Sequence, residues 1–213
     1  MPENEHVTMR IAESVGIRVV PSTLIQLSSG ERAYLTRRVD RTEKGEKIHM
    51  IDMYQITEAF DKYKGSVEKI GKALRKYSAN PLLDTTYLFD VVVFSFLTGN
   101  SDMHLKNFSM KEGASGWELA PAYDLLNVAI VLPSDHEEFA LTINGKRNKL
   151  NRSDFEQLGQ DLGLNAKQVG GTFRRMIKNK SVALDWIQRS FLSKDQKTAY
   201  LECLHNRYDR IEK

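Results

Sequence analysis

The amino-acid sequence predicts a mainly helical α+β fold, because helical patterns cover most of the chain. From residue 50 onward, apolar residues recur at the spacing of one helix face. Two pairs of short β-rich segments each flank a turn that contains glycine, which is typical of β-hairpins. Residues 85–97 are almost continuously apolar and contain no glycine or proline, so we expect them to form a buried central helix.

The N-terminal part is predicted to contain one helix and one hairpin. Apolar residues on one helical face indicate a helix over residues 6–15, and Gly16 can adopt the left-handed conformation at which such a helix ends. Residues 17–27 and 32–39 are rich in β-formers and flank Ser28-Ser29-Gly30. We therefore expect these two segments to pair as a hairpin.

The next predicted elements are helices. Residues 50–60 form one amphipathic stretch, and the apolar face of residues 67–77 indicates a second helix that ends at Asn80-Pro81. Asp84 has the residue type of an N-cap, so it is predicted to cap the central helix. The segment that follows, residues 99–107, would start at the C-terminal end of that helix.

A second hairpin is predicted beyond this segment. Residues 108–110 and 117–119 have strand character and flank a turn that contains glycine. The hairpin is expected to place Asp102 and Asp124 near opposite ends of one small sheet. Residues 124–131 are expected to begin another helical turn, and a polar loop follows them.

Capping-box patterns indicate the C-terminal helices. Ser153-x-x-Glu156, Asn165-x-x-Gln168 and Ser193-x-x-Gln196 all have the required spacing. The apolar faces of the helices that they head are Phe155/Leu158/Leu162, Val169/Phe173/Met176/Ile177 and Tyr200/Leu204/Tyr208/Ile211. No linker in the chain argues for two independent domains.

Composition excludes several classes of protein. With 31 Lys and Arg against 28 Asp and Glu, the net charge of +3 gives no electrostatic argument for nucleic-acid binding. Cys203 is the single cysteine, so no intramolecular disulfide can form, which is typical of a reducing cytoplasm. The N-terminus has no signal-peptide pattern, and the longest apolar run, residues 91–97, is too short for a membrane span. We therefore expect a cytoplasmic protein without a direct nucleic-acid or membrane partner.

The strongest functional motif is Asn-Ser-Asp-Met-His-Leu-Lys-Asn at residues 100–107, followed by a second carboxylate in Ala-Pro-Ala-Tyr-Asp. Phosphoryl transfer mainly requires that metal and phosphate are held in place and that a hydroxyl points at the γ-phosphorus. Asp102 is the candidate catalytic residue that would accept the hydroxyl proton or orient the hydroxyl. Asn107, through its amide oxygen, and Asp124 are the candidate ligands of Mg²⁺, which prefers oxygen donors.

Two further residues of the motif have predicted roles. Lys106 is a second catalytic candidate, because it could neutralise charge on the transferred phosphoryl group. His104 is interpreted as a structural residue that holds the loop, since no His or Cys stands at zinc-ligand spacing from it. A metal-dependent nuclease or hydrolase site is a less favoured interpretation, because the near-neutral charge does not suit a nucleic-acid substrate.

These motifs resemble the HipA family of bacterial serine/threonine kinase toxins. The resemblance rests on Asp102-x-His104-x-Lys106-Asn107, on Ala120-Pro121-Ala122-Tyr123-Asp124 and on Arg38-Val39-Asp40-Arg41, and it covers essentially the whole chain. It implies the helical C-terminal lobe of a protein-kinase-like fold, with a small β-hairpin remnant of the N-lobe and a short hairpin at the active site. Residues 1–41 would be the trailing part of the N-lobe and the hinge, and residues 42–213 would be the C-lobe with the catalytic loop.

The resemblance also implies a function. The chain would transfer the γ-phosphoryl group of ATP to Ser or Thr of a protein substrate, with Asp102 catalytic and with Asn107 and Asp124 binding Mg²⁺. The backbone around Arg37 and Val39 would line the adenine pocket as the hinge between the lobes. Members of the family phosphorylate proteins such as aminoacyl-tRNA synthetases. They pair with a helix-turn-helix antitoxin in a toxin-antitoxin system.

One part of the kinase pattern is not found in the sequence. Kinases grip the ATP phosphates with a glycine-rich loop and a lysine on an N-lobe strand, and neither precedes the hinge. Glu3 and Glu5 are the candidates for the helix carboxylate that pairs with this lysine. We expect that a separate N-lobe polypeptide completes the site or that the sequence is truncated, and that the isolated chain binds ATP poorly. The alternative is a degenerate, non-catalytic kinase lobe that acts as an interaction module for an antitoxin or a separate N-lobe chain.

Overall fold

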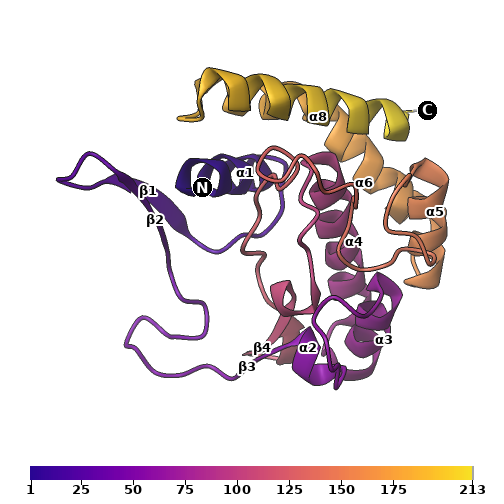
Figure 1. Ribbon diagram of the computed structural model, residues 1–213. Helices are drawn as coiled ribbons and strands as arrows, with labels where there is room; N and C mark the ends of the chain where they lie inside the picture. Colours follow the sequence, from indigo (N-terminus) through magenta and orange to yellow (C-terminus); the bar gives the residue numbers. More distant parts are fainter. Residues whose placement is uncertain (213) are drawn as a thin grey trace.

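A buried helix, α4 (Pro81–Leu97), lies at the centre of the molecule, and several other helices pack against it (Figure 1). The computed structural model describes residues 1–212. The other helices are α1 (Pro2–Ser14), α2 (Met53–Ile56), α3 (Val67–Tyr77), α5 (Arg152–Asp161), α6 (Ala166–Lys178), α7 (Lys180–Arg189) and α8 (Lys194–Glu212), with a 3₁₀ turn η1 (Leu105–Asn107). The strands are β1 (Ser22–Gln26), β2 (Arg32–Thr36), β3 (Met50–Asp52), β4 (Ser109–Gly113) and β5 (Gly116–Leu119). The predicted mainly helical α+β fold is confirmed.

Helix α4 is the predicted central helix, but it begins one turn earlier than expected. Pro81 occupies the first turn, where its fixed φ suits the helix and its missing N–H costs no hydrogen bond. The prediction that Asp84 caps the helix is therefore wrong. Asp84 lies inside the first turn, where its side chain is buried. Nearly every later side chain of α4 is also buried, so the helix forms the centre of the hydrophobic core.

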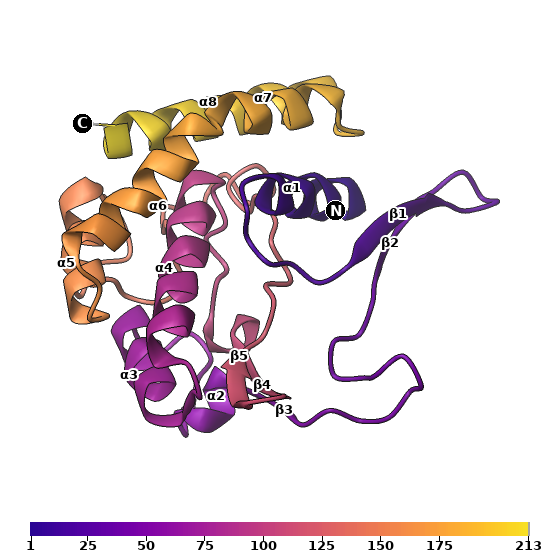
Figure 2. The same ribbon diagram turned by 180° about the vertical axis from the view of Figure 1, so that it is seen from behind.

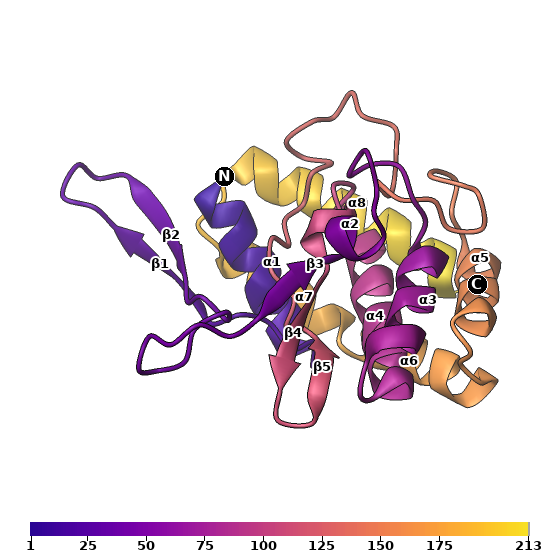
Figure 3. The ribbon, with the colours of Figure 1, turned by 90° about the horizontal axis from the view of Figure 1, so that it is seen from below.

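A three-stranded antiparallel sheet in the order β3-β4-β5 lies beside the first turn of α4 (Figure 3). The predicted second hairpin is confirmed as β4–β5, in which Met110 pairs with Leu119. The prediction of one helix over residues 50–60 is wrong at both ends, because only Met53–Ile56 is helical. Met50–Asp52 pairs with β4 as strand β3, and the short helix α2 begins only after it, with Asp52 as its N-cap.

The β1–β2 hairpin projects from the body of the molecule (Figures 1 and 2). It confirms the first predicted hairpin, although its strands are shorter than predicted, and Leu24 lies opposite Tyr34. Its side chains are half-buried or exposed, and Leu35 is 48% exposed. An irregular connection, residues 37–49, leads from this hairpin to β3.

Four C-terminal helices complete the fold, and α6 and α8 contact α4. The predicted capping boxes that begin at Asn165 and Ser193 are confirmed, each with both reciprocal hydrogen bonds. The predicted box at Ser153 is wrong, because Asn151 caps α5 and Asp154 closes the box. Helix α7 was not predicted from the sequence.

Helix α1 lies beside α7, on the side of the molecule that α8 also covers (Figure 2). It confirms the first predicted helix but begins at Pro2, where proline again suits the first turn. Its buried face includes Thr8, whose hydroxyl lies 2.9 Å from the Tyr200 hydroxyl of α8. None of the helices within residues 1–212 is both long and apolar enough to cross a membrane.

Candidate active site

The predicted catalytic loop, residues 99–107, begins where α4 ends. Backbone hydrogen bonds shape it: His104 N–H donates to the Asp102 carbonyl over 2.8 Å, and Asn107 N–H donates to the His104 carbonyl over 3.0 Å. His104 and Asn107 are buried, Asp102 is half-buried and Lys106 is exposed. The loop therefore presents Asp102 and Lys106 to solvent and keeps its imidazole and amide inside.

Gly99 fixes the start of this loop, at a point where three segments meet. Its φ of 71° lies in the left-handed region that favours glycine. A methyl group at this position would lie 2.7 Å from Cys203 Sγ and 3.0 Å from Asn127 Oδ1. The N–H groups of Val128 and Ala129 both donate to the Gly99 carbonyl, over 3.0 and 3.2 Å. The segment after β5 and the helix α8 thus both pack against the start of the catalytic loop.

Asp124 lies next to the catalytic loop. The Asn107 Nδ2 atom donates to Asp124 Oδ2 over 2.7 Å, and Asn100 Nδ2 donates to the Asp124 carbonyl over 3.5 Å. The expectation that Asp102 and Asp124 lie near opposite ends of the sheet is wrong. An antiparallel hairpin returns the chain to the end at which it started, so the segments before β4 and after β5 leave on the same side.

Asp102 and Asp124 line one cleft of about 490 Å³. Its lining also includes Asp135 and Glu137, of which Glu137 is paired with Arg147 over 3.4 Å. Met1, whose terminal ammonium lies 3.8 Å from Glu3, belongs to the lining as well. Among residues 1–212, no Lys, Arg or His belongs to this lining. A cleft lined mainly by charges of one sign concentrates ions of the other sign, so the excess of carboxylates favours a bound cation.

Glu5 of α1 is a further carboxyl group, and the charge of Asp124 acts on it. Burial, together with the negative charge of Asp124, raises the pKa of Glu5 to about 7, and among residues 1–212 no cation offsets this effect. Sequence reasoning named Glu5 only through the kinase pattern. Two neighbouring carboxyl groups of this kind would be stabilised by a metal ion or by a lysine from another segment.

Asn107 and Asp124 fit a magnesium site in the chemistry of their donor atoms. Magnesium is usually bound by one or two protein ligands and completes its shell with water and phosphate oxygens. The bond between the two side chains uses the Asn107 amide N–H, which leaves the amide oxygen and the second Asp124 oxygen as donors. Within residues 1–212, no group of three or more His, Cys, Asp and Glu is arranged to bind a metal.

Tyr123 connects the Asp124 segment to the catalytic loop, a contact that sequence reasoning missed. Its hydroxyl donates to the Lys106 carbonyl over 2.8 Å and lies 2.6 Å from the Ser109 hydroxyl. Burial raises the pKa of Tyr123 to about 12, although the Ser109 contact opposes the shift. The Lys106 side chain lies outside the lining of the cleft, and its ammonium is 4.9 Å from the centre of the Tyr54 ring.

His104 occupies a buried position in the catalytic loop. Its Nε2 atom lies 2.8 Å from Lys62 Nζ, and its ring meets the Tyr63 ring edge to face at 5.2 Å. Burial lowers the pKa of His104, and a hydrogen bond from the Lys62 ammonium requires Nε2 to accept, because an ammonium can only donate. Among residues 1–212, Nδ1 is buried without a hydrogen-bond partner, so the ring makes no bond to the loop backbone. The structural role of His104 stays a prediction.

Arg37 and Val39, the predicted hinge residues, lie in the connection that leaves β2. Arg37 N–H donates to the Pro21 carbonyl over 2.8 Å, and Val39 is half-buried against the core. Neither residue belongs to the lining of the cleft that contains Asp102 and Asp124. Their role at the adenine ring, and the boundary at residue 41, stay predictions.

Comparison with known proteins decides the family. A sequence model described as the HipA-like C-terminal domain matches residues 1–184. The chain belongs to this family. A candidate kinase of Haemophilus influenzae is 26% identical to it over 198 residues, which cover 79% of this chain and 58% of that protein. A candidate kinase of Sinorhizobium fredii, Y4mE, is 32% identical over 190 residues, which cover 83% of this chain and 44% of that protein. The HipA-like chain thus spans about half the length of these curated relatives.

Two solved structures show the same fold as this HipA-like domain. The HipA toxin of Shewanella oneidensis, solved in complex with HipB and its operator DNA, matches with a TM-score of 0.81 and 22% identity over 98% of this chain and 55% of that chain. The proinflammatory kinase CtkA of Helicobacter pylori matches with a TM-score of 0.69 and 17% identity over 99% of this chain and 84% of that chain. The predicted kinase-like helical lobe is therefore confirmed as a fold.

Proposed function

We propose that this HipA-like domain is the catalytic lobe of a kinase that transfers the γ-phosphoryl group of ATP to Ser or Thr residues of a protein. Membership of the family and the names of the relatives support the proposal. The observation that supports it most directly is that Asp102 and Asp124 line one cleft while Asn107 is bonded to Asp124. Catalysis of phosphoryl transfer depends mainly on positioning of this kind.

Each residue has a distinct role in the proposal. When bound, Mg²⁺ supplies positive charge that neutralises the phosphates. The Asp124 carboxylate and the Asn107 amide oxygen would hold it, and the half-buried Asp102 would accept the hydrogen bond of the substrate hydroxyl and take its proton. Lys106 would reach the transferred phosphoryl group only by leaving the Tyr54 ring.

The partners belong to the finer part of the proposal. The matched HipA of Shewanella oneidensis was solved with HipB and its operator DNA. By analogy, we assign a helix-turn-helix antitoxin as a partner of this chain and a protein, such as an aminoacyl-tRNA synthetase, as the phosphate acceptor. A lysine placed beside Glu5 would neutralise the Glu5–Asp124 pair, as the strand lysine does for the helix glutamate of kinases. In this proposal, the lysine belongs to the part of the relatives that the chain does not span.

Calorimetric titration of the full chain with Mg·ATP tests the proposal. We expect the wild type to bind with a Kd between micromolar and millimolar, and Asp124→Asn to weaken binding at least about tenfold, because the substitution removes a charged metal ligand. Asp209→Asn changes an exposed carboxylate on α8 in the same way and should bind like the wild type. Equal binding by the wild type and Asp124→Asn would contradict the proposed metal site.

A second candidate function is a non-catalytic kinase-like lobe that binds an antitoxin or a separate N-lobe chain. The Glu5–Asp124 pair, which no cation neutralises among residues 1–212, favours this alternative. Adding the N-terminal half of a relative as a separate polypeptide distinguishes the two functions. Restored phosphorylation would support the kinase, whereas binding without phosphorylation would support the interaction module.

A further inference from the structure

Asp124 has a backbone conformation that a residue with a side chain rarely adopts. Its φ of 57° lies in the left-handed region. The expectation that residues 124–131 begin a helical turn is wrong for residues 124–127, which are irregular, and correct only at the end, where the N–H groups of Val131 and Leu132 donate to the Val128 carbonyl. A left-handed conformation such as that of Asp124 persists only where the surrounding structure determines it from several sides.

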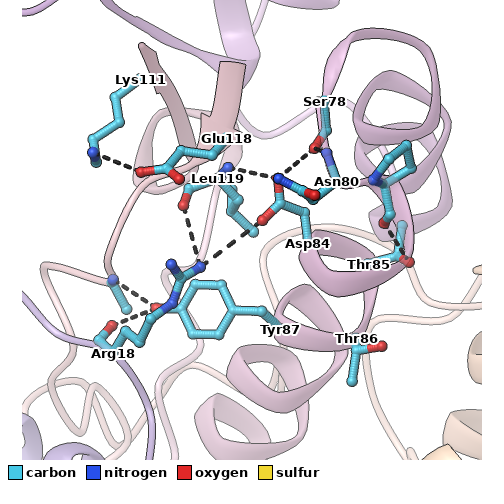
Figure 4. A network of polar contacts seen from close by, with 12 residues as sticks. Arg18, Ser78, Asn80, Asp84, Thr85, Thr86, Tyr87, Lys111, Glu118 and Leu119 are labelled. Atoms are coloured by element: carbon cyan, nitrogen blue, oxygen red, sulfur yellow. Dashed lines mark hydrogen bonds and ion pairs between the residues drawn. The ribbon is translucent and has the colours of Figure 1, made fainter. Parts of the chain in front are cut away.

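Tyr87 of α4 forms a hydrogen bond with the main chain two residues before Asp124. Figure 4 shows its ring beside Arg18. Its hydroxyl accepts a hydrogen bond from Ala122 N–H over 2.8 Å and donates one to the Arg18 carbonyl. The Arg18 guanidinium covers the Tyr87 ring, 4.4 Å from its centre. Ala122 also pairs with the crossing segment in both directions. Val20 N–H donates to its carbonyl over 3.0 Å, and its own N–H, which it shares with the Tyr87 hydroxyl, donates to the Arg18 carbonyl over 2.8 Å. We call the bonds of the Tyr87 hydroxyl the upstream clamp.

Asp84, one turn before Tyr87 on α4, fixes the strand that leads into this clamp (Figure 4). Its carboxylate accepts hydrogen bonds from Leu119 N–H over 2.8 Å and from the Ser78 hydroxyl over 2.6 Å. Arg18 lies 3.9 Å from the same carboxylate and donates to the Leu119 carbonyl over 3.4 Å. One face of α4 thus determines the course of the chain from the end of β5 to Ala122.

Asn4 of α1 forms hydrogen bonds with the main chain three residues after Asp124. Its Nδ2 atom donates to the Asn127 carbonyl over 2.8 Å, and its Oδ1 atom accepts from Asn127 N–H over 2.9 Å. Both residues are buried, with 1% and 0% of their surface exposed. We call this pair of bonds the downstream clamp.

We infer that Tyr87 and Asn4 are positioning residues that hold Asp124 in its left-handed conformation at the cleft. Neither side chain belongs to the lining of the cleft, so both act through the main chain on either side of Asp124. They belong to two different helices, so the position of Asp124 is tied to both α1 and α4. The consequence for magnesium rests on the proposed function, because it requires Asp124 to be a metal ligand.

Amide hydrogen exchange on the metal-free full chain tests the clamps without reference to metal. Tyr87→Phe removes only the hydroxyl, and we expect exchange of the amides between residues 122 and 127 to become about tenfold faster. Tyr208→Phe is a matched control, since it removes a buried tyrosine hydroxyl that donates to the Met176 carbonyl over 3.0 Å in the C-terminal helices. It should leave these amides unchanged. Unchanged exchange in Tyr87→Phe would overturn the inference.

Asn4→Ala tests the downstream clamp in the same way, with the strongest effect expected at Asn127. If Asn4→Ala does not fold, the result for Tyr87→Phe alone decides whether the inference holds, because this variant keeps the ring that packs in the core. An equal increase over the whole chain, instead of a local one, would reduce both residues to a general structural role and would overturn the inference.

Binding of Mn²⁺ in the presence of ATP, followed by electron paramagnetic resonance, measures the consequence for metal. We expect Tyr87→Phe to weaken Mn²⁺ binding several-fold and Tyr208→Phe to leave it unchanged. If the wild type binds Mn²⁺ and Tyr87→Phe binds it equally well, the positioning role is wrong. If the wild type does not bind Mn²⁺, the proposed function fails, and hydrogen exchange still decides whether the clamps hold Asp124.

Discussion

The segment around Asp124 and the β1–β2 hairpin both belong to the predicted nucleotide site, yet they are fixed to the molecule very differently. Buried side chains of α1 and α4 bind the main chain on both sides of Asp124. The hairpin projects from the body, and none of its strand residues is fully buried. Its regular hydrogen bonds are those between its own two strands.

This difference divides the predicted site into two parts, one that would bind the metal and the phosphate acceptor and one that would bind the adenine ring. The metal and acceptor side is determined by contacts within the chain, so we expect it to be formed before any ligand arrives. The adenine side depends on a hairpin and an irregular connection without a fully buried residue, which are held mainly by contacts with α1 and by Tyr34 and Val39 against the core. Segments with few buried contacts open most readily, and partner binding can order them at low cost.

Asp102→Asn should produce the largest effect, because it removes the proposed chemistry and leaves the clamped segment intact. We expect the rate of phosphoryl transfer at saturating Mg·ATP to fall by about 10²–10⁴-fold, the usual contribution of a general base. The affinity for Mg·ATP should stay within about twofold of the wild type. Phosphorylation rates of the chain combined with the N-terminal half of a relative measure the first quantity, and calorimetry measures the second. An unchanged rate would remove Asp102 from the catalytic role.

Asp84→Ala should destabilise the segment that leads from β5 to Asp124. The substitution leaves Leu119 N–H and the Ser78 hydroxyl without their acceptor, and we expect the free energy of unfolding to fall by about 3 kcal/mol. Denaturant unfolding measures the loss. Asp185→Ala removes an exposed carboxylate from an ion pair with Arg189 and should change stability by less than about 0.5 kcal/mol. Equal losses in the two variants would show that the Asp84 network does not stabilise the region.

Glu138→Gln tests how strongly the segment between Asp124 and Ala140, which contributes to the lining of the cleft, is fixed to α8 at its C-terminal end. Glu138 binds Arg210 through both oxygens, at 2.6 and 2.9 Å, and Arg207 lies 2.9 Å away. Burial raises the pKa of Glu138, but the two arginines outweigh burial, so the pKa lies below its ordinary value of 4.5. We expect the variant to lose about 2 kcal/mol of unfolding free energy at pH 7.

The pH dependence gives this prediction a second readout. A carboxyl group whose pKa is depressed by folding stabilises the protein above its unfolded pKa, and this contribution disappears as the pH falls through the folded value. The difference between the wild type and Glu138→Gln should therefore be complete above pH 4.5 and disappear as the pH falls through the depressed pKa of folded Glu138. Glu202→Gln, at an exposed position on α8, should show no difference in either pH range. A difference that is constant with pH would mean that the loss comes from packing.

Leu35→Thr should produce the smallest effect. Leu35 is 48% exposed on β2, and threonine is a good strand former, so we expect the unfolding free energy to change by less than about 0.5 kcal/mol. Leu88→Ala, at a fully buried position of α4, sets the scale with an expected loss of about 2–5 kcal/mol. A large loss from Leu35→Thr would mean that the hairpin is fixed to the body after all.

Sequence patterns predicted the elements whose structure depends on local burial. The apolar stripes of α6 and α8 were correct, and that of α3 was correct except for Tyr77, which is 46% exposed. A face that repeats every 3.6 residues is buried as a helix. Strand β3 was missed, since Met50–Asp52 is a strand only through hydrogen bonds to β4, far away in the sequence. Local pattern does not distinguish such a short strand from the start of a helix.

The same distinction applies to the candidate site. The motif at residues 100–107 and Asp124 was visible from residue types and spacing, and the structure places Asp102 and Asp124 at one cleft. The conformation of Asp124 was not predictable, because it depends on side chains that lie 35 and 123 residues away from the main-chain groups they bind. No local sequence pattern indicates that Tyr87 and Asn4 are the residues that bind the main chain around Asp124.

The contact between Gly99 and Cys203 gives the molecule a chemical reporter. Cys203 is the chain's single thiol, and it lies against the glycine from which the catalytic loop starts. Burial raises its pKa, which disfavours the reactive thiolate while α8 is in place. Cys203 is half-buried, so we expect alkylation of the unmodified protein to become faster whenever α8 separates from the loop. The rate at which a single label is incorporated thus reports on movement beneath the active site, with and without a ligand in the cleft.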